Sequence, residues 1–172
     1  MSVSVDELHR GFLRLLEAHR PAPLTPAGDA ETRDPAAECF GCRAVDPRAK
    51  GYDLDATVHP GQVVATAEFL DTHGFAIDTV TGVDWLPAGQ MEVVYDYFHP
   101  AASIRVVVRT RLPRSQPEVP TISAVFPGAN WHERETHEFF GIRFLGHPNL
   151  TPLLLPEDAD FHPLRKDYPG AA

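Results

Sequence analysis

The sequence predicts an α+β domain, a two-layer sandwich in which a mixed, mostly antiparallel sheet carries helices on one face, followed by an extended proline-rich C-terminal arm. Three observations predict this fold. Apolar and polar residues alternate along several middle segments, as in strands buried on one face. Two other segments have the apolar spacing of amphipathic helices. Five prolines lie between 146 and 172, where they forbid a continuous helix.

Length and composition indicate one domain with excursions. At 172 residues and 43% apolar content, the chain can bury a real core. We divide it into an N-terminal helix (1–19), a linker or insertion (20–50), a core domain (51–145) and the arm (146–172). The net charge of -9 disfavours a nucleic-acid binder, and two cysteines disfavour a disulfide-stapled scaffold. No run approaches a membrane span or a signal peptide, so we expect a soluble protein that meets a membrane only through partners.

The elements follow from caps, breakers and periodicity. Ser4 and Glu7 form a capping box that starts the first helix. The stretch 20–50 lacks periodicity and is rich in Pro, Ala and Gly, which predicts a surface linker. Gly82 is expected to end one strand. The predicted order is a helix over 4–18, the linker, a strand over 52–58, a helix over 60–74, strands over 75–81, 91–97, 103–112 and 121–126, a helix over 131–140, and the arm. In the strand over 103–112, three arginines face away from the apolar side: Arg105, Arg109 and Arg111.

The predicted helix over 131–140 has both ends marked in the sequence. Asn130 and Glu133 form a second capping box, and Gly141 provides the left-handed stop. The helix is rich in His and Glu, but a zinc protease motif needs two histidines four residues apart, and His137 lies five after His132. We therefore reject a zinc site here. Glu133 and His137 share a face, which we interpret as a solvated surface pair.

Glu135 is the unusual residue of this helix. It lies on one stripe with Trp131 and Phe139, so the sequence predicts a partly buried carboxylate among apolar side chains. We expect an ion pair with Arg143 or Arg165 that orients helix and arm.

Arg134 and Glu138 are four residues apart on the same helix. This spacing predicts a surface ion pair of little energetic value.

Cys39 and Cys42 form a lone C-x-x-C. A structural zinc site needs four ligands, and no second cysteine pair or histidine pair lies nearby. The motif also does not open a helix after a strand, as thioredoxin-like sites do. Incidental thiols or a loop disulfide are favoured over a shared metal site or a redox role.

The arm carries apolar residues that need a surface, either its own domain's or a partner's. The basic tip of Arg165 and Lys166, next to Asp167, favours docking through acidic groups beneath it. The apolar residues are Leu150, Leu153, Leu154, Leu155, Phe161, Leu164 and Tyr168.

The helix and arm together resemble a known family, the 30-kilodalton subunit of NADH:quinone oxidoreductase, which is respiratory complex I. The resemblance covers roughly residues 52–169, and the upstream runs 81–84 and 94–95 share it. His137 and Glu138 depart from the family pattern, which usually has an aromatic residue and Asp there. The residues that carry the resemblance are Glu133, Arg134, Glu135, Phe140, Gly141, Ile142, Phe144, Gly146, His147, Pro148, Leu150, Leu154, Pro156, Pro163, Leu164, Arg165, Lys166, Asp167, Tyr168 and Pro169.

The resemblance implies a structural, non-catalytic subunit of a peripheral arm. Such a subunit binds no cofactor and supports a large subunit with a quinone or nickel-iron site, while small neighbouring subunits hold iron–sulfur clusters. It implies a place at the cytoplasmic face of the cell membrane. Relatives serve in membrane-bound hydrogenases and formate hydrogenlyase, so the type of complex stays open.

Two alternatives belong to other classes. One is a small metal- or thiol-binding protein that uses Cys39 and Cys42. The other is an independent hydrolase that uses His132, His137 and Glu135.

Overall fold

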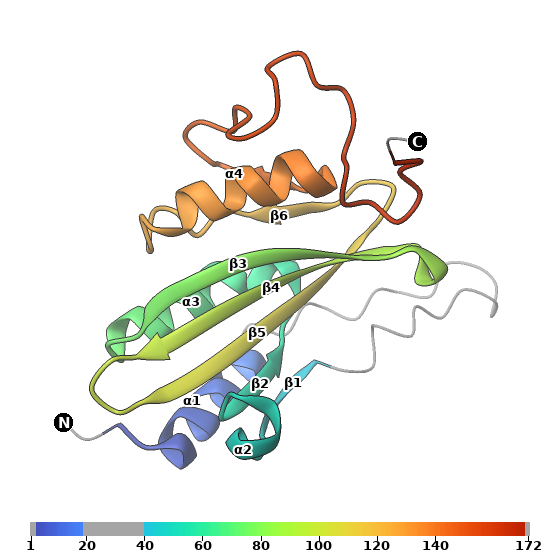
Figure 1. The fold of residues 1–172 in the computed structure, drawn as a ribbon. Helices are drawn as coiled ribbons and strands as arrows, with labels where there is room; N and C mark the ends of the chain where they lie inside the picture. Colours follow the sequence, from blue (N-terminus) through green and yellow to red (C-terminus); the bar gives the residue numbers. More distant parts are fainter. Residues whose placement is uncertain (1–2, 19–39, 171–172) are drawn as a thin grey trace.

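The computed structural model describes residues 3–18 and 40–170, and its centre is a five-stranded sheet in the order β1-β2-β5-β4-β3. In Figure 1, α1 and α3 lie behind this sheet and α4 lies beside β3. A second sheet pairs β6 with β7. The elements are α1 (Val5–Ala18), β1 (Gly41–Ala44), α2 (Pro47–Lys50), β2 (Leu54–Thr57), η2 (Pro60–Gln62), α3 (Val63–Thr72), β3 (Ala76–Trp85), η3 (Leu86–Ala88), β4 (Gln90–His99), β5 (Ile104–Pro113), β6 (Glu118–Pro120), α4 (Ala129–Phe140) and β7 (Arg143–Leu145).

The pairing confirms the predicted mixed, mostly antiparallel sheet. Strands β3, β4 and β5 form an antiparallel meander, β5 pairs in parallel with β2, and β2 pairs antiparallel with β1. The apolar residues of the alternating strands face the helices, where Tyr95, Val106 and Leu54 are fully buried. Leu8 of α1 and Leu70 of α3 close the core from the other side.

The opposite face of the sheet is polar. As predicted, the arginines of β5 lie there, and each meets an acidic residue. The pairs of Arg105 are partly exposed and contribute little stability, whereas the carboxylates paired with Arg109 and Arg111 are buried and need these partners. The pairs are Arg105 with Asp78 and with Asp96 (2.9 Å), Arg109 with Asp55 (3.1 Å), and Arg111 with Glu92 (3.0 Å).

Gly82 does not end a strand, and that prediction was wrong. Strand β3 continues through Gly82 to Trp85. A Cβ at Gly82 would lie 2.5 Å from Cδ2 of Phe140. The glycine therefore lets the end of α4 approach the sheet closely, which is a packing role and not a breaking one.

The strand predicted over 121–126 was also wrong. Residues 121–128 form turns, and the strand lies earlier, at β6, where Glu118–Pro120 pairs in parallel with β7. Helix α4 begins at Ala129 with Gly128 as its N-cap and no side-chain capping bond, so the predicted cap at Asn130 was wrong as well. The first helix, α1, agrees with its prediction, and the Glu7 N–H donates to Oγ of Ser4 at 3.3 Å.

The stretch interpreted as a linker contains two elements that sequence reasoning missed. Strand β1 adds to the sheet edge beside β2, and the short helix α2 follows it, with the Asp46 side chain as cap. Residues 19–39 lie outside the described part of the chain. Within the described ranges, no helix is long and apolar enough to cross a bilayer.

Candidate functional site

The candidate site is helix α4 with the arm, here defined as residues 146–170, that wraps it. No helix or strand lies within the arm. Helix α4 ends where Gly141 takes a left-handed conformation (φ 74°) and donates its N–H to the His137 carbonyl. A Cβ at Gly141 would collide with the side chains of Arg165 and His162. Glycine therefore serves both the helix stop and the close approach of the arm.

Glu133 and Glu138, not Glu135, are the buried carboxylates of α4, so the prediction for Glu135 was wrong. The Thr121 hydroxyl donates to Oε2 of Glu133, and the Ile122 N–H donates to Oε1 at 2.8 Å. Nε2 of His147 lies 3.8 Å from Oε2. Burial raises the pKa of Glu133 to about 7, and it outweighs these hydrogen bonds, which favour the ionised form. The predicted solvated pair of Glu133 and His137 was therefore wrong too.

Glu135 lies on the exposed side of α4 with Trp131. Among the described residues it has no ion-pair or hydrogen-bond partner. The two arginines proposed for it are engaged elsewhere: Arg143 pairs with Glu118 at 2.5 Å, and Nε of Arg165 donates to the Phe140 carbonyl at 2.7 Å. Trp131 and Glu135 thus face outward and Phe139 is half-buried, because the sheet and the arm cover the other sides of the helix.

Glu138 holds the first part of the arm. Its buried carboxylate accepts the backbone N–H groups of Leu153 (2.7 Å), Leu154 (3.0 and 3.1 Å) and Leu155 (3.2 Å). Three converging amides form a concave anion site of the kind that backbone nests make. Glu138 therefore fixes the path of the arm here by binding its main chain, not its side chains.

Arg134 completes this attachment. Its guanidinium donates to the carbonyls of Thr151 and Pro152, both at 2.8 Å, and to the Thr151 hydroxyl at 3.3 Å. The predicted surface pair of Arg134 with Glu138 was wrong, because both side chains reach the arm instead of each other.

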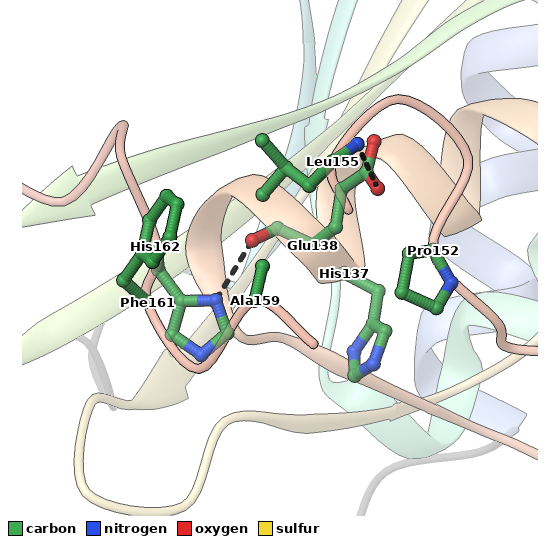
Figure 2. Close-up of a pocket in the computed structure, with 7 residues that line it drawn as sticks. All are labelled: His137, Glu138, Pro152, Leu155, Ala159, Phe161 and His162. Carbon is green, nitrogen blue, oxygen red and sulfur yellow. Dashed lines mark hydrogen bonds between the residues drawn. The ribbon is translucent and has the colours of Figure 1, made fainter. Parts of the chain in front are cut away.

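The last turn of α4 is covered by the second part of the arm. Nδ1 of His162 contacts the Glu138 carbonyl at 2.8 Å, and the Leu164 N–H donates to the Phe139 carbonyl at 3.2 Å. With Arg165 on Phe140, the arm satisfies three of the carbonyls that a helix end leaves without partners. Figure 2 shows Glu138 and His162 beside a cavity of about 60 Å³, too small for a substrate.

The tip of the arm is anchored on Asp84, at the end of β3. Arg114 makes a two-pronged pair with the fully buried Asp84 carboxylate (2.9 and 3.1 Å) and also bonds Asp167 at 2.6 Å. The Lys166 N–H donates to Asp84 at 2.8 Å. Burial opposes ionisation, but the bonds from Arg114 and Lys166 outweigh it and lower the pKa of Asp84. The tip thus docks through the Asp167 carboxylate and the Lys166 N–H. The Arg165 side chain instead binds the carbonyl at the end of α4.

Asp84 and Arg114 were missed as anchors by sequence reasoning. The sequence did contain an indication: Asp84 is four residues after Val80, so the alternation along the strand turns both side chains toward the core. A charged residue at such a position needs a partner.

The start of the arm turns at Gly146, which has φ 81°. His147 follows with its side chain buried; Nε2 contacts the Asn130 carbonyl at 3.2 Å, and Nδ1 accepts the Asn149 N–H at 3.1 Å. Burial lowers the pKa of His147, which favours the neutral ring. Pro148 is exposed and Pro163 is half-buried.

Cys42 lies on β1, away from α4. Burial, assisted by the charge of Asp55, raises the pKa of its thiol to about 12, which disfavours a thiolate. Cys39 lies outside the described residues. No group of three or more His, Cys, Asp or Glu side chains is placed to hold a metal ion within residues 3–18 and 40–170. His132 and His137 are not brought together with Glu135 into a catalytic arrangement.

Five large apolar side chains are exposed on α4, on β7 and along the arm, among polar and charged ones. Trp131 is 66% exposed, Leu154 63% and Leu164 51%, and Leu145 and Phe161 are also exposed. We call these five residues the apolar surface. Leu154, Phe161 and Leu164 lie on the arm that Arg134, Glu138 and Asp84 attach to the domain, and Trp131 and Leu145 lie on α4 and β7, so these side chains are held in place without being buried.

A family model described as respiratory-chain NADH dehydrogenase, 30 Kd subunit, matches residues 56–172. The chain belongs to this family. The match begins within β2 and runs through the whole arm, so it covers α4 and the residues that anchor the arm in this chain. Strand β1 and Cys42 lie before it.

Named relatives agree with the 30 kDa subunit family. The chain is 40% identical over 125 residues to the C subunit of NADH-quinone oxidoreductase from Roseiflexus castenholzii, covering 70% of this chain and 72% of that protein. It is 44% identical over 103 residues to the combined C/D subunit from Citrobacter koseri, covering 60% of this chain but only 17% of that much longer protein.

Two solved structures share the fold. A chain of the membrane-bound sulfane sulfur reductase, an archaeal respiratory membrane complex, has a TM-score of 0.64 at 22% identity, over 90% of this chain and 81% of that chain. The trypsin-resistant fragment of Nqo5 has a TM-score of 0.52 at 28% identity, over 60% of this chain and 92% of the fragment.

Proposed function

We propose that this chain is a cofactor-free structural subunit of a complex I-like redox complex, in which it supports the large subunit that carries the quinone site. The observation that carries the proposal is the apolar surface. Apolar side chains that are exposed on a rigid backbone are typical of protein interfaces. The arm is already bound to its own domain, so its outward residues are available to a neighbour.

The partner follows from the relatives. Proteins named as C/D subunits join a C-like segment of about a sixth of their length to a much longer remainder. Fusion in one polypeptide supports a D-type large subunit in the place next to this chain. Small iron–sulfur subunits complete the expected set, and the complex places the chain at the cytoplasmic face of the membrane.

The experiment is affinity purification of the tagged chain from its native membranes. We expect a D-type large subunit to co-purify together with iron–sulfur subunits, and the isolated chain to contain no metal or chromophore. If the tagged chain is recovered without any other subunit under conditions that keep such complexes intact, the proposal is rejected. Nickel in the co-purified large subunit would assign the complex to the hydrogenase type instead of the quinone type.

The apolar surface is tested by Leu154→Glu. We expect this variant to lose the large subunit while the isolated chain keeps its melting temperature, because the side chain is 63% exposed. The matched control is Leu13→Glu on α1, whose side chain is 40% exposed and far from the arm along the chain. If both variants retain the large subunit equally, the apolar surface is not part of the interface.

A further inference from the structure

Strand β3 is an edge strand of the five-stranded sheet, and part of its main chain lacks partners. The carbonyls of Arg105 and Arg109 on β5 accept N–H groups from the β2 side, at Asp53 and Val58. Main-chain groups alternate in direction along a strand. With the register through β4, this alternation turns Thr81 and Val83 toward β4 and turns Val80 and Gly82 outward.

These outward groups remain largely unpaired. The Val80 carbonyl accepts the Thr136 hydroxyl at 3.1 Å, which confirms its outward direction. The Val80 N–H, the Gly82 N–H and the Gly82 carbonyl have no partner within the described ranges, although both residues are buried. A buried main-chain group without a partner costs about as much as a lost hydrogen bond.

A groove of about 190 Å³ lies over this edge. Its floor is β3 from Thr79 to Gly82, and its walls come from α4 and the arm. The walls are apolar at Phe139, Phe140 and Leu164, and Glu135 adds a carboxylate without a partner among the described residues. Two residues of the stripe that the sequence predicted in the core, Glu135 and Phe139, therefore line this groove.

We propose that the groove over β3, which we call the β3 edge groove, receives an extended segment of a neighbouring subunit as an additional strand. The segment carries an apolar residue for the Phe139 and Leu164 wall and a basic residue for Glu135. This inference rests on the proposed function, since it requires a neighbouring subunit. Extended backbone is needed because only a strand presents acceptors and donors at the spacing of the free β3 groups.

Charge favours a different chain over a second copy of this one. Two copies paired at β3 would each bring a Glu135 carboxylate and a net charge of -9 to the contact. A basic segment carries the charge opposite to the Glu135 carboxylate and to the net charge of this chain, so it is attracted to the groove.

The first test is hydrogen exchange of individual amides in the full chain, alone and in the complex purified from membranes. We expect the amides of Val80 and Gly82 to exchange at least about tenfold more slowly in the complex. The amide of Thr81 is the internal control, because β4 already holds it. Equal exchange of Val80 and Gly82 in both states overturns the inference, even where the large subunit is recovered with the chain and the proposed function stands.

The second test is charge reversal at the groove. We expect Glu135→Lys to lower the yield of complex at least about fivefold with an unchanged melting temperature. Glu68→Lys, an exposed helical position on α3, should leave the yield unchanged. Equal yields for both variants overturn the inference. Concentration-dependent protection of Val80 and Gly82 in the isolated chain would do the same, by assigning the groove to a second copy, and the absence of any complex would overturn this inference together with the proposed function.

Discussion

Replacing Glu138 by Gln removes the charge that holds the arm while keeping the size of the side chain. The carboxylate accepts three backbone N–H groups at 2.7 to 3.2 Å. Hydrogen bonds to a charged acceptor are about twice as strong as neutral ones, and the Gln nitrogen would face the Leu154 N–H at the position of one oxygen. We expect a local loss of about 1.4 to 2.8 kcal/mol, which corresponds to a factor of about 10 to 100.

The assay is native-state exchange of the amides of Leu153, Leu154 and Leu155, which should accelerate by that factor in Glu138→Gln. Cleavage of the arm by a non-specific protease should accelerate in parallel. Glu135→Gln is the control, because its side chain is exposed on the same helix and touches no arm amide. If the two variants exchange alike, the carboxylate of Glu138 does not set the position of the arm.

Three further predictions concern the carboxylates and one glycine. The pKa of Glu133 is raised from 4.5 to about 7 in the folded chain, so its ionisation lowers the free energy of unfolding as pH rises through this window. Relative to the parent, the free energy of unfolding of Glu133→Gln should therefore rise by about 3 kcal/mol between pH 4.5 and 7, as measured by urea unfolding. Asp84→Asn should lower the free energy of unfolding by about 2 to 3 kcal/mol at pH 7, since Arg114 loses its two-pronged partner. The difference should shrink as pH falls below 3.8, because the unfolded carboxyl of the parent takes up its proton there and the folded carboxyl does so only at its lowered pKa; a difference that persists at low pH would contradict the ion-pair origin. Gly82→Ala should cost about 1 to 3 kcal/mol by overpacking, whereas Gly41→Ala, with open space around it, should change stability by less than about 0.5 kcal/mol.

The long strands and their inward faces were predictable because each carries its own alternating pattern. Strands β4 and β5 are ten residues long, and the period of two holds along most of their length. Strands β1 and β6 have only four and three residues, so no period can establish itself. Their pairing partners, β2 and β7, decide that they are strands, and that information is not local.

The orientation of α4 was mispredicted for a related reason. Trp131 and Phe139 suggested a buried stripe, since large apolar residues usually mark the core side of a helix. In the structure the helix is enclosed on two sides, by the sheet and by the arm, and polar residues face both. Glu133 and Glu138 are buried because backbone amides from other segments satisfy them, which spacing along one helix cannot reveal.

The attachment of the arm fixes the path of its main chain without fixing which residue types it carries. Glu138 and Arg134 bind main-chain N–H and C=O groups of residues 151–155, and every residue type except proline supplies the same N–H. The side chains at Leu153 to Leu155 are therefore not chosen by this attachment. Substitutions there can alter the surface offered to a neighbour while the path of the chain stays the same. Relatives can thus differ in which neighbour they bind without compensating changes elsewhere in the fold.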